Sequence, residues 1–258
     1  MKMVHQSSDK VYWHKYLDFY ERFLPKRLNC IVEIGVFQGD SIRYWREKYP
    51  SSHIYGLDIV DFNPSWPTDP NIAYFQLDQS NISRYREVMG SIGKKVDLLI
   101  EDGSHDPLHQ KISLMESINF LNEGSIYILE DLHTSLQIHP YYQKRLKEYN
   151  NTLGFFKKKS QSMLMSLQGL LLIDHYKTNE IDLKTNKPNV DYSQSLFSYE
   201  ELEILYQKVK KIHFYRRSVL PNYCFACKTN DFDFVSLKCA CGVDLYSGVD
   251  SMSAILEF

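Results

Sequence analysis

Apolar positions follow two different periodicities along this 258-residue chain. Near the start they recur at helical spacing, which predicts an amphipathic helix within residues 9–23, carried by Val11, Trp13, Tyr16, Leu17, Tyr20 and Phe23. From residue 30 they gather in short runs that predict buried strands at Cys30–Gly35, His53–Asp58, Ile72–Leu77, Val96–Glu101 and Ser125–Glu130. Helices between such strands imply a mostly parallel sheet with helices on both faces, a Rossmann-like α/β fold.

The second half of the chain carries a weaker pattern. Ser198 and Glu201 have the spacing of a capping box and predict a helix that runs to Lys211. Two further strands are expected at Ile212–Tyr215 and Tyr223–Cys227. The last thirty residues contain no clear motif, so we expect a C-terminal extension at 229–258.

Charge and hydropathy limit the partners that we expect. A net charge of −2 gives no reason to expect broad attraction to nucleic acid or to an anionic membrane. The longest apolar run, about Gly169–Ile173, is far too short to span a bilayer. The first fifteen residues contain no apolar leader, so we expect a cytoplasmic protein.

A glycine turn follows the first predicted strand. Gly35 and Gly39 let backbone amides and the start of the next helix approach a ligand closely, although a tight turn alone explains them equally well. Their spacing differs from the dinucleotide fingerprint G-x-G-x-x-G. Asp58, about twenty residues later, is placed to accept hydrogen bonds from a ribose diol, as in nicotinamide cofactors and S-adenosylmethionine alike. Asp78 and Gln79 are suited to an adenine edge but are also typical of a loop.

Acidic residues end the next two predicted strands. Asp102 follows one strand, and Glu130 and Asp131 follow the other, so the fold brings the three carboxylates together. Three carboxylates at one point repel each other unless a cation neutralises them, and oxygen ligation suits Mg²⁺. The alternative is that they are ordinary acidic loop residues. His105, just before a helix start, is the natural general base for deprotonating a hydroxyl.

The five cysteines argue for reduced thiols rather than a secreted disulfide framework. Four of them cluster late in the chain: Cys224, Cys227, Cys239 and Cys241. Four clustered thiols suggest a zinc knuckle, but cysteines three apart on a strand point to opposite faces. The sequence therefore favours buried free thiols and leaves zinc as the alternative.

With these residues in view, the chain resembles the metal-dependent sugar O-methyltransferases of macrolide antibiotic pathways, the mycinamicin and tylosin type, and their relatives in surface-glycan gene clusters. The resemblance covers about residues 8–135, and Ile212–Lys228 more loosely. Its most specific parts are Asp102-Gly103-Ser104-His105 and Glu130-Asp131-Leu132-His133-Thr134-Ser135. Further similar segments are Ser8-Asp9-Lys10 with His14 and Tyr16, Glu33-Ile34-Gly35 through Gly39-Asp40-Ser41, Tyr55-Gly56-Leu57-Asp58-Ile59 and Asp78-Gln79-Ser80.

The resemblance implies a single class I methyltransferase domain over 1–258, with a seven-stranded, mostly parallel sheet. It makes 8–135 the cofactor and metal core, 136–200 the substrate lid, and Tyr223–Lys228 the last strand. It implies Mg²⁺ or another divalent cation on Asp102, Glu130 and Asp131, with His105 as base and Asp102 in the catalytic set. The residues implied for S-adenosylmethionine are Lys10, Tyr16, Glu33, Gly35, Phe37, Gly39, Ser41, Asp58, Asp78, Gln79 and Asp102.

The expected activity is methyl transfer to a sugar hydroxyl. A nucleotide-linked sugar or a capsule or lipopolysaccharide precursor is the first acceptor class that we expect, with a macrolide glycoside or a catechol-like diol as alternatives. A non-catalytic S-adenosylmethionine-binding module and a nicotinamide dehydrogenase are the other interpretations, the latter disfavoured by the glycine spacing. We expect no nucleic-acid or membrane partner, and the sequence leaves a homo-oligomer open.

Overall fold

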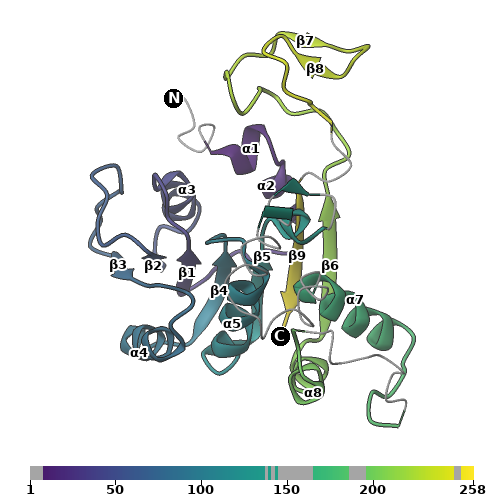
Figure 1. The fold of residues 1–258 in the computed structure, drawn as a ribbon. Coiled ribbons are helices and arrows are strands. Elements are labelled where there is room, and N and C mark those ends of the chain that lie inside the picture. Colours follow the sequence, from purple (N-terminus) through teal and green to yellow (C-terminus); the bar gives the residue numbers. More distant parts are fainter. Residues whose placement is uncertain (1–7, 137–138, 141–142, 145–164, 186–195, 247–250) are drawn as a thin grey trace.

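Seven strands pair into one sheet, in the order β3-β2-β1-β4-β5-β9-β6 (Figure 1). The computed structural model describes residues 8–136, 139–140, 143–144, 165–185, 196–246 and 251–258. The strands of this sheet are β1 (Cys30–Ile34), β2 (His53–Asp58), β3 (Ile72–Gln76), β4 (Val96–Glu101), β5 (Leu121–Leu129), β6 (Lys211–Arg216) and β9 (Met252–Glu257). The first five run parallel, and β9 lies antiparallel between β5 and β6. The predicted sheet, with its seven strands, is confirmed.

Helices cover both faces of the sheet. On one face α4 (Ile82–Ile92), α5 (Pro107–Ser117), α7 (Met165–Thr178) and α8 (Tyr199–Lys208) bury apolar side chains against the strands. On the other face α2 (Tyr16–Tyr20) and α3 (Asp40–Lys48) do the same. Along β1, Val32 packs with the first group and Ile31 with the second, because successive side chains of a strand point to opposite faces. Both faces of the sheet are therefore buried from solvent, as is typical of parallel sheets.

The last strand of the sheet is β9, and the strand predicted at Tyr223–Cys227 is wrong. Ala254, Ile255 and Leu256 are fully buried in β9, whereas Tyr223 is 47% exposed and lies in an irregular turn. A short run of aromatic and cysteine residues has the composition of a strand, but here the cysteines turn towards one another. The segment between β6 and β9 instead forms a small hairpin of β7 (Phe232–Asp233) and β8 (Lys238–Cys239).

The predicted N-terminal helix is two short helices, α1 (Asp9–Tyr12) and α2. Lys15 breaks them apart with φ 61, a left-handed conformation that cannot continue a right-handed helix. The capping box predicted at Ser198 and Glu201 is confirmed at the start of α8. After β5 a 3₁₀ helix, η2 (Leu132–Ser135), carries the chain away from the sheet.

Much of the predicted substrate lid, 136–200, lies outside the described residues. The part that the structure describes includes α7, whose buried Leu170 and Ile173 belong to the core of one sheet face. The lid therefore stays a prediction. No helix within the described ranges has the length and apolar character needed to cross a membrane.

Candidate active site

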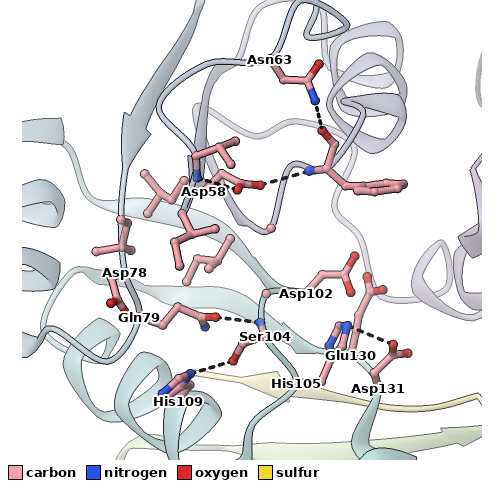
Figure 2. Close-up of a pocket in the computed structure, with 18 of the residues that line it drawn as sticks. Asp58, Asn63, Asp78, Gln79, Asp102, Ser104, His105, His109, Glu130 and Asp131 are labelled. Atoms are coloured by element: carbon pink, nitrogen blue, oxygen red, sulfur yellow. Dashed lines mark hydrogen bonds and ion pairs between the residues drawn. The ribbon is translucent and has the colours of Figure 1, made fainter.

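The carboxyl ends of β1, β2, β4 and β5 surround a cavity of about 510 Å³. It lies between the ends of β1 and β4, where the strand order reverses: β2 and β3 lie on one side of β1, and β4 and β5 lie on the other. Doubly wound sheets bind ligands at such a switch point. Figure 2 shows Asp58 on one side of this cavity and Asp102, Glu130 and Asp131 on the other. The predicted site residues that line it are Gly35, Phe37, Asp58, Asp78, Gln79, Asp102, His105, Glu130 and Asp131.

The turn after β1 is shaped by Asp58 and by a close backbone approach. Gly35 has φ +88, and a Cβ at this position would lie 2.0 Å from the carbonyl oxygen of Asp102. A glycine is therefore required there. The Oδ2 atom of Asp58 accepts hydrogen bonds from the N–H groups of Val36 (2.8 Å) and Phe37 (3.1 Å). The predicted ribose acceptor thus also fixes the turn beside it.

Gln79 is buried, and both ends of its amide are bonded within the protein. Its Nε2 donates to Oε1 of Glu101 (2.5 Å) and to Oγ of Ser113 (2.9 Å). Its Oε1 accepts from the N–H of Ser104 (2.8 Å), which holds the turn after β4. Gln79 therefore positions that turn, and its contact with adenine stays a prediction. Asp78 also lines the cavity, and its bonds to the hydroxyl and N–H of Ser80 lower the pKa of its carboxyl.

Asp102, His105 and Asp131 come together at the ends of β4 and β5. One potential ligand atom from each lies within 4.8 Å of the others. The Nε2 atom of His105 lies 3.4 Å from Oδ2 of Asp131. Both of these residues have φ 55, a conformation that is uncommon outside glycine and that concentrates at functional sites. The prediction that the two strand ends converge is confirmed.

The surroundings keep Asp131 charged. Its burial raises the pKa, but the nearby His105, His14 and His133 and a hydrogen bond from Tyr16 hold it well below its usual range. The Tyr16 hydroxyl donates to Oδ1 of Asp131 over 2.8 Å. The ring of His14 stacks on Tyr16 at 4.8 Å between centroids, and its Nδ1 lies 2.8 Å from the Ser251 hydroxyl. The N-terminal helices thus close this side of the site.

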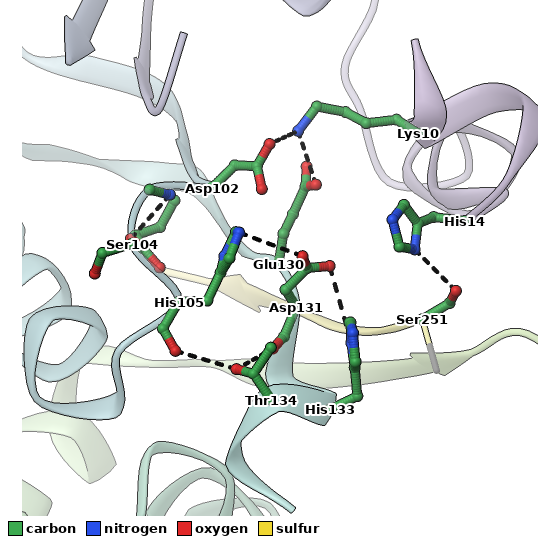
Figure 3. A network of polar contacts seen from close by, with 12 residues as sticks. Lys10, His14, Asp102, Ser104, His105, Glu130, Asp131, His133, Thr134 and Ser251 are labelled. Carbon is green, nitrogen blue, oxygen red and sulfur yellow. Dashed lines mark hydrogen bonds and ion pairs between the residues drawn. The ribbon is translucent and has the colours of Figure 1, made fainter. Parts of the chain in front are cut away.

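Lys10 is a buried countercharge that joins Asp102 and Glu130 (Figure 3). Its Nζ donates to Oδ2 of Asp102 (2.5 Å) and to Oε2 of Glu130 (2.7 Å), and it lies 3.6 Å from Oε1 of Glu33. Burial lowers the pKa of Lys10, but the three carboxylates outweigh it and raise that pKa well above the usual value. The resemblance implied that Lys10 contacts the cofactor, which stays a prediction; the structure shows this ionic contact.

The donor set fits a divalent cation. Carboxylate oxygens of Asp102 and Asp131 are the ligands that Mg²⁺ prefers. Burial raises the pKa values of Asp102 and Glu130 even though Lys10 opposes the effect. Oε1 of Glu130 is buried without a hydrogen-bond partner, an arrangement that costs free energy and that additional positive charge would relieve. Glu130 lies deeper than the other two acids, and its role as a ligand stays a prediction.

Five predicted residues are not among the described residues that line the cavity: Lys10, Tyr16, Glu33, Gly39 and Ser41. Lys10 and Tyr16 bond to the acids that do line it. Glu33 is fully buried and accepts a hydrogen bond from Nε1 of Trp45 over 2.9 Å. Gly39 has φ +79, and a Cβ there would lie 2.7 Å from Cδ of Pro67, so it shapes the loop.

The cavity also contains residues that sequence reasoning left unassigned. Ser104 lies inside the Asp-Gly-Ser-His motif, which was a usable signal, and its hydroxyl lies 2.8 Å from Nδ1 of His109. Asn63 comes from a loop with no periodic pattern, so nothing marked it. Its Nδ2 donates to the carbonyl oxygen of Phe37 (3.2 Å) and ties that loop to the glycine turn.

No family model matches the chain. It is 32% identical over 166 residues to an 8-demethyl-8-alpha-L-rhamnosyl tetracenomycin-C 2'-O-methyltransferase of Streptomyces olivaceus, covering 60% of this chain and 43% of that protein. It is 31% identical over 112 residues to the mycinamicin VI 2''-O-methyltransferase of Micromonospora griseorubida, covering 41% of this chain and 27% of that one. The chain thus spans less than half the length of these relatives.

A solved structure of the MycE methyltransferase from the mycinamycin biosynthetic pathway, in complex with Mg and SAH, superimposes with a TM-score of 0.56 at 21% identity. The match covers 82% of this chain and 50% of that one. The fold is that of a class I methyltransferase. The two relatives reported above are O-methyltransferases of antibiotic glycosides, as the sequence resemblance predicted.

Proposed function

We propose that this chain is an S-adenosylmethionine-dependent and divalent-cation-dependent O-methyltransferase that acts on a sugar hydroxyl. The observation that carries the proposal is the group of Asp102, His105 and Asp131, whose ligand atoms lie within 4.8 Å of one another on the wall of the 510 Å³ cavity. The relatives named above methylate sugar hydroxyls of glycosides, which supports the same reaction here.

The cofactor half of the cavity is built from β1 and β2. Asp58 faces the ribose position predicted from the sequence, beside the glycine turn that it holds in shape. Phe37 is 77% exposed beside the same cavity and offers an apolar ring to a ligand. Asp78 lies at the end of β3, where the adenine is expected.

The acceptor half is built from β4 and β5. A divalent cation on Asp102 and Asp131 would lower the pKa of a bound sugar hydroxyl and orient it. His105 takes the proton at Nε2, and the charged Asp131 at 3.4 Å stabilises the resulting imidazolium. The deprotonated oxygen then forms its bond to the methyl carbon as the carbon–sulfur bond of the sulfonium breaks. Lys10 meanwhile neutralises part of the negative charge on Asp102 and Glu130.

The acceptor class is the finer part of the proposal. A nucleotide-linked sugar or a surface-glycan precursor is the first class to test, and a rhamnosyl or macrolide glycoside the second, since the relatives are named for such acceptors. A panel that contains both classes and a catechol distinguishes them. Transfer to the glycosides alone would place the chain with its antibiotic relatives.

Calorimetric binding tests the cofactor before any acceptor is known. We expect S-adenosylmethionine to bind the wild-type protein and Asp58→Ala to weaken it by at least ~10-fold, with NADH as a negative control. A preference for NADH would contradict the methyltransferase proposal.

Transfer of a labelled methyl group to the acceptor panel then tests the reaction. We expect His105→Gln to lower the rate by at least ~100-fold while cofactor binding is kept. The matched control is His53→Gln, because His53 begins β2 at the opposite end of the sheet. Full activity of His105→Gln would remove the proposed base.

A further inference from the structure

Four cysteines that lie outside the active site converge on one point. Cys224 and Cys227 come from the loop after β6, and Cys239 and Cys241 come from the end of the β7–β8 hairpin. Their four Sγ atoms all lie within 4.8 Å of one another. The Sγ atoms of Cys224 and Cys241 are 3.6 Å apart, and those of Cys227 and Cys239 are 3.4 Å apart.

These separations fit a metal and not disulfides. A disulfide joins its sulfurs at about 2.05 Å, and all five cysteines of the chain are free. A tetrahedral zinc ion with Zn–S bonds of about 2.3 Å places its four sulfurs about 3.8 Å apart. The observed sulfur separations lie around this value. Each cysteine offers one sulfur, which matches the ligand count of a structural zinc site.

The backbone around the cysteines is folded into two tight turns. The N–H of Lys228 donates to the carbonyl oxygen of Cys224 (3.0 Å), and the N–H of Gly242 donates to that of Cys239 (2.7 Å). Lys228 and Gly242 both have positive φ, 59 and 90. Each turn therefore brings its two cysteines to the same side, which the strand predicted from the sequence would have prevented.

The segment has almost no hydrophobic core of its own. In the stretch that the structure describes from 222 to 246, the buried residues are Cys224, Cys239 and Leu245. Two of the three are members of the cysteine cluster, while Phe234 and Val235 are 71% and 96% exposed. A segment this small buries too little apolar surface to be stabilised by its own core, and such segments are usually held by a cross-link or a metal.

We propose that Cys224, Cys227, Cys239 and Cys241 bind a structural zinc ion. The four thiols release four protons as the four Zn–S bonds form, and no electron is transferred. This site shares no residue with the carboxylates of Asp102 and Asp131, and it holds whether or not the proposed methyl transfer is correct.

The zinc site supports the helix that carries Lys10. The N–H of Asn222 donates to the carbonyl oxygen of Tyr12 (2.7 Å), and Nζ of Lys228 donates to its hydroxyl (2.5 Å). Tyr12 and Trp13 share a buried cluster with Cys224, Cys239 and Leu245. Since α1 also positions Lys10 against Asp102 and Glu130, the zinc segment acts as a positioning element for the active site.

Metal analysis of the full chain, purified without chelator and dialysed against Mg²⁺, tests the site. We expect about one zinc per chain in the wild type, and less than about 0.2 in Cys227→Ser and in Cys241→Ser, whose ligands are the exposed ones. Cys30→Ala is the matched control, because Cys30 is buried in β1 away from the cluster, and it should keep its zinc. Asp131→Asn should keep zinc as well, which separates this site from the carboxylates.

Cobalt exchange and hydrogen exchange give readouts that do not depend on the stability of a variant. Wild-type protein loaded with Co²⁺ should show the thiolate charge-transfer and visible bands of tetrahedral cobalt. Removal of zinc should raise amide exchange in residues 9–20, which the segment supports. A wild-type protein that lacks zinc and gives no cobalt–thiolate bands would overturn the proposal, and so would disulfides among these cysteines or iron in place of zinc.

Discussion

The ammonium group of Lys10 lies 2.5 Å from the carboxylate of Asp102, although 92 positions separate the two residues in the chain. The contact joins α1 to the end of β4 and places a positive charge at the predicted metal site. With Glu130 at 2.7 Å, Lys10 holds together acids that come from two different strands. The active site therefore depends on α1, a short helix that lies outside the alternating strands and helices of the sheet.

Replacement of Lys10 by methionine should unfold the site. We expect Lys10→Met to lower the free energy of unfolding in urea by about 3–5 kcal/mol, because it leaves buried carboxylates without their partner. Added Mg²⁺ should recover part of this loss. The control Lys26→Met removes an exposed lysine and should stay within about 0.5 kcal/mol of wild type. A loss below about 1 kcal/mol in Lys10→Met would show that the ion pair is unimportant.

Two glycines with positive φ allow the cost of backbone strain to be measured apart from the cost of a steric clash. Gly124→Ala should cost about 1–2 kcal/mol, because φ is +77 but nothing lies within 4 Å of the added Cβ. Gly35→Ala should cost more than about 3 kcal/mol, since its Cβ would collide with the carbonyl oxygen of Asp102. Only Gly35→Ala should also weaken S-adenosylmethionine binding in calorimetry. Equal losses in both variants would mean that the close approach is not important.

Much of this architecture is predictable because the signals are local. Each parallel strand is a short apolar run, and the residues that follow the strands meet at one edge of the sheet. This is why Asp58, Asp102 and Asp131 could be placed around one cavity from their positions alone. The geometry of Gln79 was not predictable, since its partners Glu101 and Ser113 belong to other elements.

The failures have physical reasons as well. In sequence, Lys10 is one lysine in an amphipathic segment, and nothing there reveals a partner 92 positions away. Tyr223–Cys227 has the aromatic and cysteine composition of a strand. The sequence therefore predicted a strand where the chain forms a turn that brings Cys224 and Cys227 together. The true last strand, β9, comes after an irregular segment without a clear pattern, and pairing with β5 and β6 is what fixes it.

The pKa of Glu101 predicts a pH dependence of stability. Burial raises that pKa from 4.5 to about 7, although His105 and the hydrogen bond from Gln79 oppose the rise. The folded state then binds a proton that the unfolded state has lost between pH 4.5 and 7, so stability falls as the pH rises through this window. We expect Glu101→Gln to remove this part of the decline, an effect on the order of 3 kcal/mol between pH 5 and pH 8.

Urea unfolding in EDTA, repeated across pH 5–8, measures this difference without bound metal. Glu87→Gln is the control, because Glu87 is an exposed glutamate whose side chain is 67% exposed. Its stability should follow the wild-type curve. If the difference between Glu101→Gln and wild type stayed constant with pH, Glu101 would be charged throughout the range.

Removal of the divalent cation should abolish methyl transfer but preserve cofactor binding. The cofactor contacts expected at Asp58 and the glycine turn lie on the other side of the cavity from Asp131 (Figure 2). In buffer that lacks Mg²⁺ but keeps the proposed structural zinc in place, we expect the transfer rate to fall at least ~100-fold while calorimetric affinity for S-adenosylmethionine changes less than ~3-fold. Added Mg²⁺ should restore the wild type but not Asp131→Asn, whereas Asp18→Asn, a change at an exposed position of α2, should behave as wild type. Transfer that persists without Mg²⁺ would leave His105 and Lys10 as the whole of the catalytic machinery, and the carboxylates would then serve only to hold those two residues in place.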